Sequence, residues 1–198
     1  MIPAVYFDAA KAIVARYGDA LNDKVYVDIT NPVALATFEG LAVPADSSAA
    51  EELQKITGAS VVKAFNTTFA ATLGEGAVAG HVLDVLIAGD DEAAIQAVVD
   101  FAAAAGLNPV VVGPQRRARQ LEQTGFLHIL LSANEELPAY QWNSGVKLVP
   151  AAWSWSPPRG PGPRRLVEVP RHQCRPRPVQ WGAAFAVAEW TSTGAALG

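Results

Sequence analysis

The stretch Val-Tyr-Val-Asp-Ile-Thr-Asn-Pro, residues 25–32, joins a β-branched apolar run to a polar end that closes on a proline. A short apolar run predicts a strand that is covered on both faces, and Asn-Pro predicts the turn that ends it. Residues 60–68, Ser-Val-Val-Lys-Ala-Phe-Asn-Thr-Thr, repeat this arrangement. The two segments therefore predict two buried strands with Thr and Asn side chains where they end.

Helical patterns lie between the strand patterns on both sides of this pair. Ser48 and Glu51 have the spacing of a capping box, which predicts a helix that begins at residue 49 and ends near Thr57. Asp90 or Asp91 is placed to cap another helix, and Pro114 suits the first turn of a third. Further strands are predicted at 82–88 and 109–112, and helices at 8–21, 91–105 and 114–132. This alternation predicts an α/β fold: a partial Rossmann-like sheet of four parallel strands, flanked by helices.

Composition restricts the class of protein. The chain of 198 residues is 51% hydrophobic and 17% charged, as in globular domains, and its net charge of −4 argues against binding to nucleic acid. Cys174 is the single cysteine, so no internal disulfide can form. Neither a basic leader nor a run of about 20 apolar residues is present, so we expect a cytoplasmic protein with no membrane partner.

The composition changes at Ala151. Residues 151–198 contain six arginines and no lysine, seven of the fourteen prolines and four of the five tryptophans. They show no sustained period of 3.6 or 2, so we expect residues 1–150 to form the domain and 151–198 a poorly ordered Pro/Arg/Trp-rich tail. Two explanations remain open: translation of GC-rich DNA out of frame, and an ordinary Pro/Arg-rich disordered tail.

The ends of the strands are the first place to look for a site, because ligands bind beyond the carboxyl ends of parallel strands. Thr30 with Asn31, and Asn66 with Thr67, can offer hydroxyl and amide groups to a ligand. The alternative is that Thr30 and Asn31 only form the turn before Pro32.

Other patterns suggest structural roles. Residues 74–80 are glycine-rich, but they precede a strand instead of following one, so we interpret them as a flexible loop and not as a phosphate loop. The three histidines share no ligand spacing with Cys174, so no metal site is expected, and His128 is assigned to a helix face. Arg119 and Glu122 have the i,i+3 spacing of an ion pair.

Five segments occur in an order that is recognisable as a set: residues 25–32, 46–52, 61–67, 88–91 and 113–122. Together they resemble the NADPH-dependent reductases of the deazaflavin coenzyme F-420 and the broader NADP oxidoreductase family around them, over about residues 2–149. The resemblance implies hydride transfer between NADPH and a deazaflavin or similar small-molecule electron acceptor. It assigns no catalytic acid or base, because the protein mainly holds two rings face to face.

The resemblance also implies which residues contact the ligands. Pro3, Thr30, Asn31 and Pro32 would border the nicotinamide of NADP. Residues Phe65, Asn66 and Thr67 would border the acceptor, the substrate in this reaction. Gln115 and Arg117 depart from the family's Gly-Pro-Leu-x-Asn pattern.

Members of this family begin with a strand, a glycine-rich loop and a helix that hold the NADPH pyrophosphate, and this sequence contains no such segment. Ile2-Pro3 resembles the end of a later strand in the family, so we expect a truncated oxidoreductase that binds NADPH more weakly than about 1 mM. The alternatives are a non-catalytic fragment and a Rossmann-like interaction module. Homo-oligomerisation is compatible with all three.

Overall fold

The computed structural model describes residues 1–149. The sequence-based predictions for residues 151–198 lie outside this range. Within the described range, no helix is both long and apolar enough to span a membrane.

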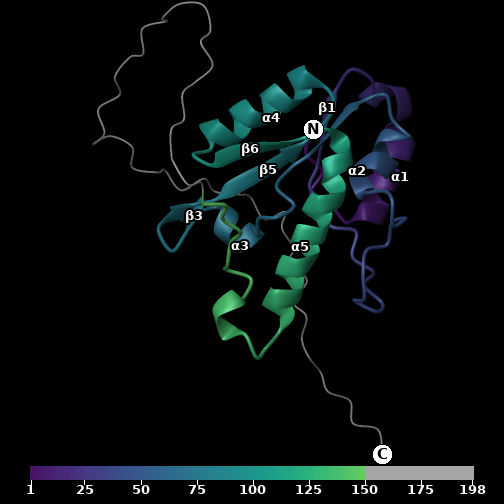
Figure 1. Cartoon of the computed structure of the whole chain (residues 1–198). Helices are drawn as coiled ribbons and strands as arrows, with labels where there is room; N and C mark the ends of the chain where they lie inside the picture. Colours follow the sequence, from purple (N-terminus) through teal and green to yellow (C-terminus); the bar gives the residue numbers. More distant parts are fainter. Residues whose placement is uncertain (150–198) are drawn as a thin grey trace, which may run out of the picture. The chain divides into compact units, whose positions relative to one another are not determined.

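The centre of the fold is a four-stranded sheet with the order β1-β2-β5-β6 (Figure 1). A separate pair, β3 and β4, forms a short hairpin. The strands are β1 (Val25–Asp28), β2 (Ser60–Lys63), β3 (Ala77–Val78), β4 (His81–Val82), β5 (Asp84–Ala88) and β6 (Asn108–Gly113). The four sheet strands occupy the predicted positions, which confirms the α/β class with a Rossmann-like sheet.

The direction of the strands differs from the prediction at the centre of the sheet. β1 pairs with β2 in parallel, and β5 with β6 in parallel, but β2 and β5 are antiparallel and meet at the single pair Lys63–Ala88. The sheet is therefore mixed, and the expectation of four parallel strands was wrong at this junction. A parallel connection needs a crossover of a dozen or more residues, usually a helix. Residues 64–83 instead contain one short helix and the β3–β4 hairpin.

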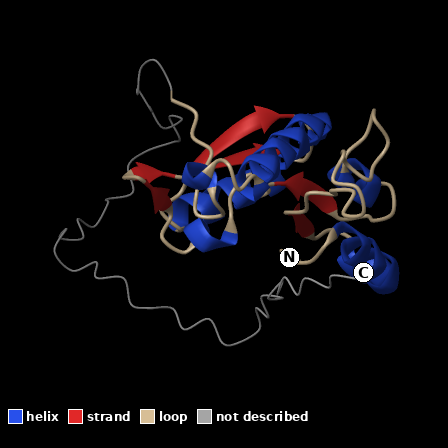
Figure 2. Ribbon diagram, turned by 90° about the horizontal axis from the view of Figure 1, so that it is seen from below, coloured by secondary structure: helices blue, strands red, loops and turns tan. Residues whose placement is uncertain are grey.

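Helices cover both faces of the sheet (Figures 1 and 2). α4 packs against β5 and β6, and its side chains Val98 and Ala102 join the core on that face. On the opposite face, α1 and α2 pack over β1 and β2, and Leu121 of α5 contacts the core beside Leu86 and Ala88 of β5. The helices are α1 (Phe7–Tyr17), α2 (Ala49–Gln54), α3 (Ala70–Leu73), α4 (Glu92–Ala104) and α5 (Ala118–Ala133), with 3-10 turns at Gly18–Leu21, Gln115–Arg117 and Pro138–Tyr140.

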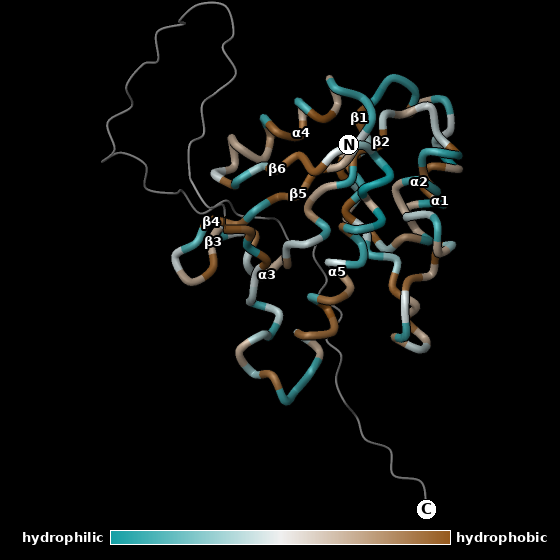
Figure 3. Tube along the Cα trace, in the orientation of Figure 1, coloured by the Kyte–Doolittle hydropathy of each residue, from teal (hydrophilic) through white to brown (hydrophobic). Residues whose placement is uncertain are grey.

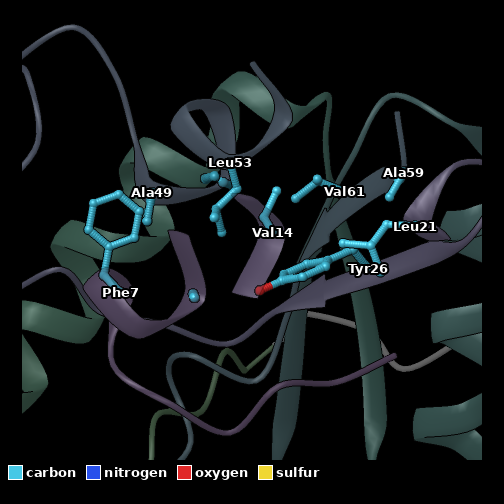
Figure 4. Packing of buried hydrophobic residues seen from close by; sticks show 11 residues of the cluster. Phe7, Val14, Leu21, Tyr26, Ala49, Leu53, Ala59 and Val61 are labelled. Carbon is cyan, nitrogen blue, oxygen red and sulfur yellow. The ribbon is translucent and has the colours of Figure 1, made fainter. Parts of the chain in front are cut away.

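The strands divide their side chains between two cores, as alternation along a strand requires. Tyr26 and Val61 point into the cluster under α1 and α2, where Val14 and Leu53 are fully buried (Figure 4). Val27 and Val62, the next residues along each strand, point into the cluster under α4. Burial in the first cluster raises the pKa of the Tyr26 hydroxyl to about 12, with a smaller contribution from the nearby Asp28 carboxylate.

The predictions of helix caps from short sequence patterns were confirmed, whereas the interpretation of the glycine-rich segment was not. Ser48 caps α2 by accepting from the Glu51 N–H, and Asp91 caps α4 by accepting from the Ala94 N–H. Residues 74–80 were interpreted wrongly as a flexible loop, because 77–82 pair as a hairpin. Its turn residues Ala79 and Gly80 both have positive φ, as the favoured two-residue hairpin turn requires.

Candidate functional site

The structure brings together the two polar strand ends that the sequence singled out. The Asn31 amide donates to the Asn66 carbonyl over 2.7 Å, and the Asn66 amide donates back to Asn31 Oδ1 over 2.9 Å. The predicted nicotinamide side and the predicted acceptor side are therefore direct neighbours. The parallel pairing of β1 and β2 produces this contact, because it places both strand ends at one edge of the sheet.

Helix α5 closes this edge. The Asn66 amide also donates to the Leu121 carbonyl over 2.8 Å, which fixes the helix to the end of β2. Gly125 lies directly against Asn31: a Cβ at this position would be 2.4 Å from Asn31 Oδ1. Glycine at position 125 thus permits the close approach of α5 to the paired asparagines.

A buried ionic cluster lies directly behind the two strand ends. The Lys63 ammonium contacts Asp28 Oδ2 at 2.7 Å and Glu122 Oε1 at 2.8 Å, and all three side chains are 0–1% exposed. Lys63 also donates to the Thr30 carbonyl, and Glu122 Oε2 accepts from the Ala49 N–H at the start of α2. Burial raises the pKa of the Glu122 carboxyl, and Lys63 offsets part of that rise. The cluster connects β1, β2, α2 and α5, and it holds the backbone of Thr30 in place.

Several buried polar atoms at this edge have no hydrogen-bond partner among residues 1–149. They include Thr30 Oγ1, Asn66 Oδ1 and Thr67 Oγ1, from side chains that are at most 5% exposed. Buried polar atoms in native proteins are nearly always paired with protein, water or ligand. The three atoms belong to residues that were predicted to bind ligands, and they are hydrogen-bonding capacity that the described fold does not use.

Phe65 adds backbone strain at the same edge. Its φ is +61°, in the left-handed region that bulky side chains rarely adopt, and such strain concentrates at functional sites. Its ring, however, packs in the core under α4 and meets Phe101 edge-on, with centroids 6.1 Å apart. Phe65 therefore shapes the turn into Asn66 and Thr67 through its backbone, while its ring is committed to the core.

The two predicted prolines lie next to β1. Pro32 is buried and its carbonyl accepts from the Ala42 N–H, which closes the loop 33–41. Pro3 is half-buried and follows Met1, whose terminal ammonium donates to the Val25 carbonyl and whose carbonyl accepts from the Val27 N–H. The first residues of the chain thus pair with the free edge of β1.

The ends of β5 and β6 do not contribute to this site. Because β5 is antiparallel to β2, Asp90 and Gln115 lie near the start of β2, where the Gln115 amide donates to the Val61 carbonyl and its backbone N–H to Asp90. The expectation that the ends of all four strands would form one edge was therefore wrong for this pair.

The predicted Arg119–Glu122 pair does not form. Arg119 instead makes two hydrogen bonds to the Glu51 carboxylate, at 2.7 and 2.8 Å, and these hold the pKa of Glu51 below its ordinary value. A groove of about 840 Å³ lies beside Arg119, between α5 and the loop that contains Val43 and Asp46. Arg119 is already paired with Glu51, and the groove includes none of the predicted site residues.

Lys63 and Glu122 are the site residues that the sequence reasoning missed. Lys63 belongs to the apolar strand pattern at residues 60–68, and Asp28 belongs to the one at residues 25–32. One charge of each sign in two neighbouring buried strands was a usable signal of a buried pair, because isolated buried charges are rarely tolerated.

Solved structures resemble this arrangement. A candidate F-420-dependent NADP-reductase from Arthrobacter sp. FB24 is 27% identical, with a TM-score of 0.61 over 66% of this chain and 61% of that one. A hypothetical protein from Sinorhizobium meliloti is 28% identical, with a TM-score of 0.52 over 58% and 56%. The chain thus spans about three fifths of the length of these proteins. Protein-family models and curated proteins gave no match.

Proposed function

We propose that residues 1–149 provide the nicotinamide and acceptor side of an NAD(P)-dependent oxidoreductase, which transfers a hydride between NADPH and a deazaflavin or similar ring. The observation that carries this proposal is the paired edge at Asn31 and Asn66, with its unused buried polar atoms. The similarity to the candidate NADP-reductase supports the same reaction class.

The residues at the edge fit a nicotinamide. Its carboxamide has donors and acceptors, and Thr30 Oγ1 and Asn66 Oδ1 are buried groups that lack partners within residues 1–149. Pro3, Thr30, Asn31 and Pro32 would hold this ring, and Asn66 and Thr67, with the backbone of Phe65, would hold the acceptor. The nicotinamide, when bound, supplies the hydride.

The chain itself would hold the two rings in position and exclude water from them. Lys63 fixes the Thr30 carbonyl, and the reciprocal asparagine bonds fix the separation between the two halves of the site. Such preorganisation is what hydride transfer requires of a protein, because proper alignment of two rings contributes more than acid-base chemistry. We therefore assign the chain's role to binding and orientation.

The experiment compares two hydride donors with the full chain: NADPH and reduced nicotinamide mononucleotide, each at millimolar concentration with coenzyme F-420 as acceptor. Because the sequence offers no phosphate loop, both donors should react at rates within about tenfold of each other. A true contact to the 2′-phosphate or pyrophosphate would add more than about 1.4 kcal/mol, which is a factor of ten. Asn66→Ala should lower both rates together.

The outcomes separate the alternatives. Oxidation of both donors that depends on Asn66 supports the oxidoreductase. Absence of any reaction, with no binding of the mononucleotide, would refute the proposal and favour a non-catalytic fragment or an interaction module.

A further inference from the structure

His128 and Ser144 form a pair that the proposed hydride transfer does not use. The Ser144 hydroxyl lies 2.8 Å from His128 Nε2, the distance of a direct hydrogen bond. His128 is on α5 and is 5% exposed, whereas Ser144 is half-buried, in the segment that follows the last 3-10 turn. A hydroxyl bonded to an imidazole is the arrangement of a serine nucleophile and its general base.

The environment of the ring suits a base. Burial lowers the pKa of His128, so that the imidazole is neutral at neutral pH, and the adjacent Thr67 backbone offsets part of this shift. Nδ1 has no hydrogen-bond partner within residues 1–149. A proton on Nδ1 leaves the Nε2 lone pair directed at Ser144, whose hydroxyl is 2.8 Å from Nε2 and 3.4 Å from a second acceptor, the Tyr140 carbonyl.

The segment that carries Ser144 is fastened on both sides. Gly145 packs so closely on Val78 of β3 and on Leu83, between β4 and β5, that a Cβ would lie 2.7 Å from the Leu83 side chain. Further along, the Lys147 ammonium and the Leu148 N–H both bind the Asp84 carboxylate at the start of β5. The Ser144 hydroxyl is thus held at the imidazole by two independent anchors.

Aromatic side chains and one backbone N–H lie around this pair. Phe69 stacks on the His128 ring with centroids 4.0 Å apart, and Trp142, which is 48% exposed, meets Phe69 edge-on at 5.2 Å. These rings form an apolar wall beside the imidazole. The N–H of Gly145, which follows Ser144, donates to no group within residues 1–149, and we assign it as the candidate oxyanion donor.

We propose that Ser144 is a nucleophile, activated by His128, that accepts the acyl group of small esters with an apolar or aromatic acyl part. Ser144 Oγ bonds to the ester carbonyl carbon while its proton passes to His128 Nε2. The bond from that carbon to the alcohol oxygen then breaks, and the alcohol leaves with the same proton. Water repeats the sequence on the acyl-serine and releases the acid, which restores both side chains.

The test treats the full chain with a biotin-tagged fluorophosphonate and identifies the modified peptide by mass spectrometry. We expect labelling of Ser144, loss of that label in Ser144→Ala, and a rate at least about 100-fold lower in His128→Gln, the scale of general-base assistance. Ser132→Ala is the matched control, since Ser132 is buried one turn further along α5 and should leave labelling unchanged.

A second variant distinguishes loss of the general base from loss of the fold. His128→Phe keeps an aromatic ring against Phe69 but removes the base, so it should fold and still fail to label. No label on Ser144 in the wild-type chain would overturn the proposal, as would an unchanged labelling rate in a folded His128→Phe chain. Neither outcome involves NADPH or coenzyme F-420, so this test is independent of the proposed hydride transfer.

Discussion

The two halves of the sheet, β1 with β2 and β5 with β6, differ in the kinds of side chain that they bury. β2 ends in the fully buried Lys63, which contacts the carboxylates of Asp28 and Glu122. Polar side chains that lack partners within residues 1–149 follow both β1 and β2. β5 continues as the apolar run Val85 to Ala88, which packs on α4 through Val85 and Ile87 and on α5 through Leu86 and Ala88. In Figure 3 the tube along β5 and β6 is mostly brown, the hydrophobic end of the scale. The half with β5 and β6 also buries a carboxylate, Asp84, but its partners Asn108, Lys147 and Leu148 satisfy it. Because unpaired buried polar groups oppose folding, those at the ends of β1 and β2 indicate where the molecule uses its chemistry.

The largest expected effect is on the buried ionic cluster. Lys63→Met removes the cation that faces Asp28 and Glu122 and leaves both carboxylates buried without it. We expect a loss of about 3–5 kcal/mol in the free energy of unfolding, measured by urea denaturation. Lys55→Met is the control, because Lys55 is exposed and should change stability by less than about 0.5 kcal/mol. Equal effects at both lysines would remove the distinction between the two halves.

The next effect concerns the approach of α5 to the site. Gly125→Ala places a methyl group 2.4 Å from Asn31 Oδ1, so either the helix or the asparagine pair must move. We expect a loss of about 1–3 kcal/mol, as for other overpacked positions, together with weaker binding of reduced nicotinamide mononucleotide. Gly40→Ala, where no atom lies within 4 Å of the new Cβ, should be nearly neutral in the same measurements. Unchanged mononucleotide binding in Gly125→Ala would show that the asparagine pair does not contribute to the ligand site.

A smaller effect is expected in the apolar half. Ile87→Val removes one buried methylene from the cluster under α4 and should cost about 1 kcal/mol. It should leave mononucleotide binding unchanged, because β5 does not reach the paired asparagines through any hydrogen bond of the described residues. Thermal and urea denaturation measure the first quantity, and titration of the mononucleotide measures the second. Impaired binding in this variant would show that the two halves are coupled.

The smallest effects distinguish two glutamates by the sign of their pH dependence. Burial raises the pKa of Glu122 in the folded chain, so its contribution to stability is complete below its unfolded value of 4.5 and is lost as the pH rises through the folded pKa. Glu122→Gln should therefore become more stable relative to the wild type as the pH rises. Hydrogen bonds from Arg119 lower the pKa of Glu51, so its contribution is present above 4.5 and lost as the pH falls. Glu51→Gln should accordingly lose stability relative to the wild type above that pH, and urea denaturation across the acid range measures both trends.

The sequence predicted what depends on local patterns. Strand positions followed from runs of apolar residues, and the caps at Ser48 and at Asp90 or Asp91 followed from local spacing, with Ser48 and Asp91 as the caps in the structure. Prediction from the sequence failed where contacts between residues far apart in the chain determine the structure. The reversal of β5 depends on how residues 64–83 pack, and Glu122 turns inward to Lys63 because α5 lies across the strand ends. No i,i+3 rule within one helix can anticipate a partner 59 positions away in sequence.

The central claim is that the nicotinamide binds at the polar ends of β1 and β2. The most direct test is an NMR titration of the full, isotope-labelled chain with reduced nicotinamide mononucleotide, which can detect millimolar affinity. We predict saturable shifts of the amide signals of Thr30, Asn31, Asn66 and Thr67, with the signals of Leu86 and Val110 unchanged. Shifts confined to β5 and β6, or to the groove beside Arg119, would contradict the claim.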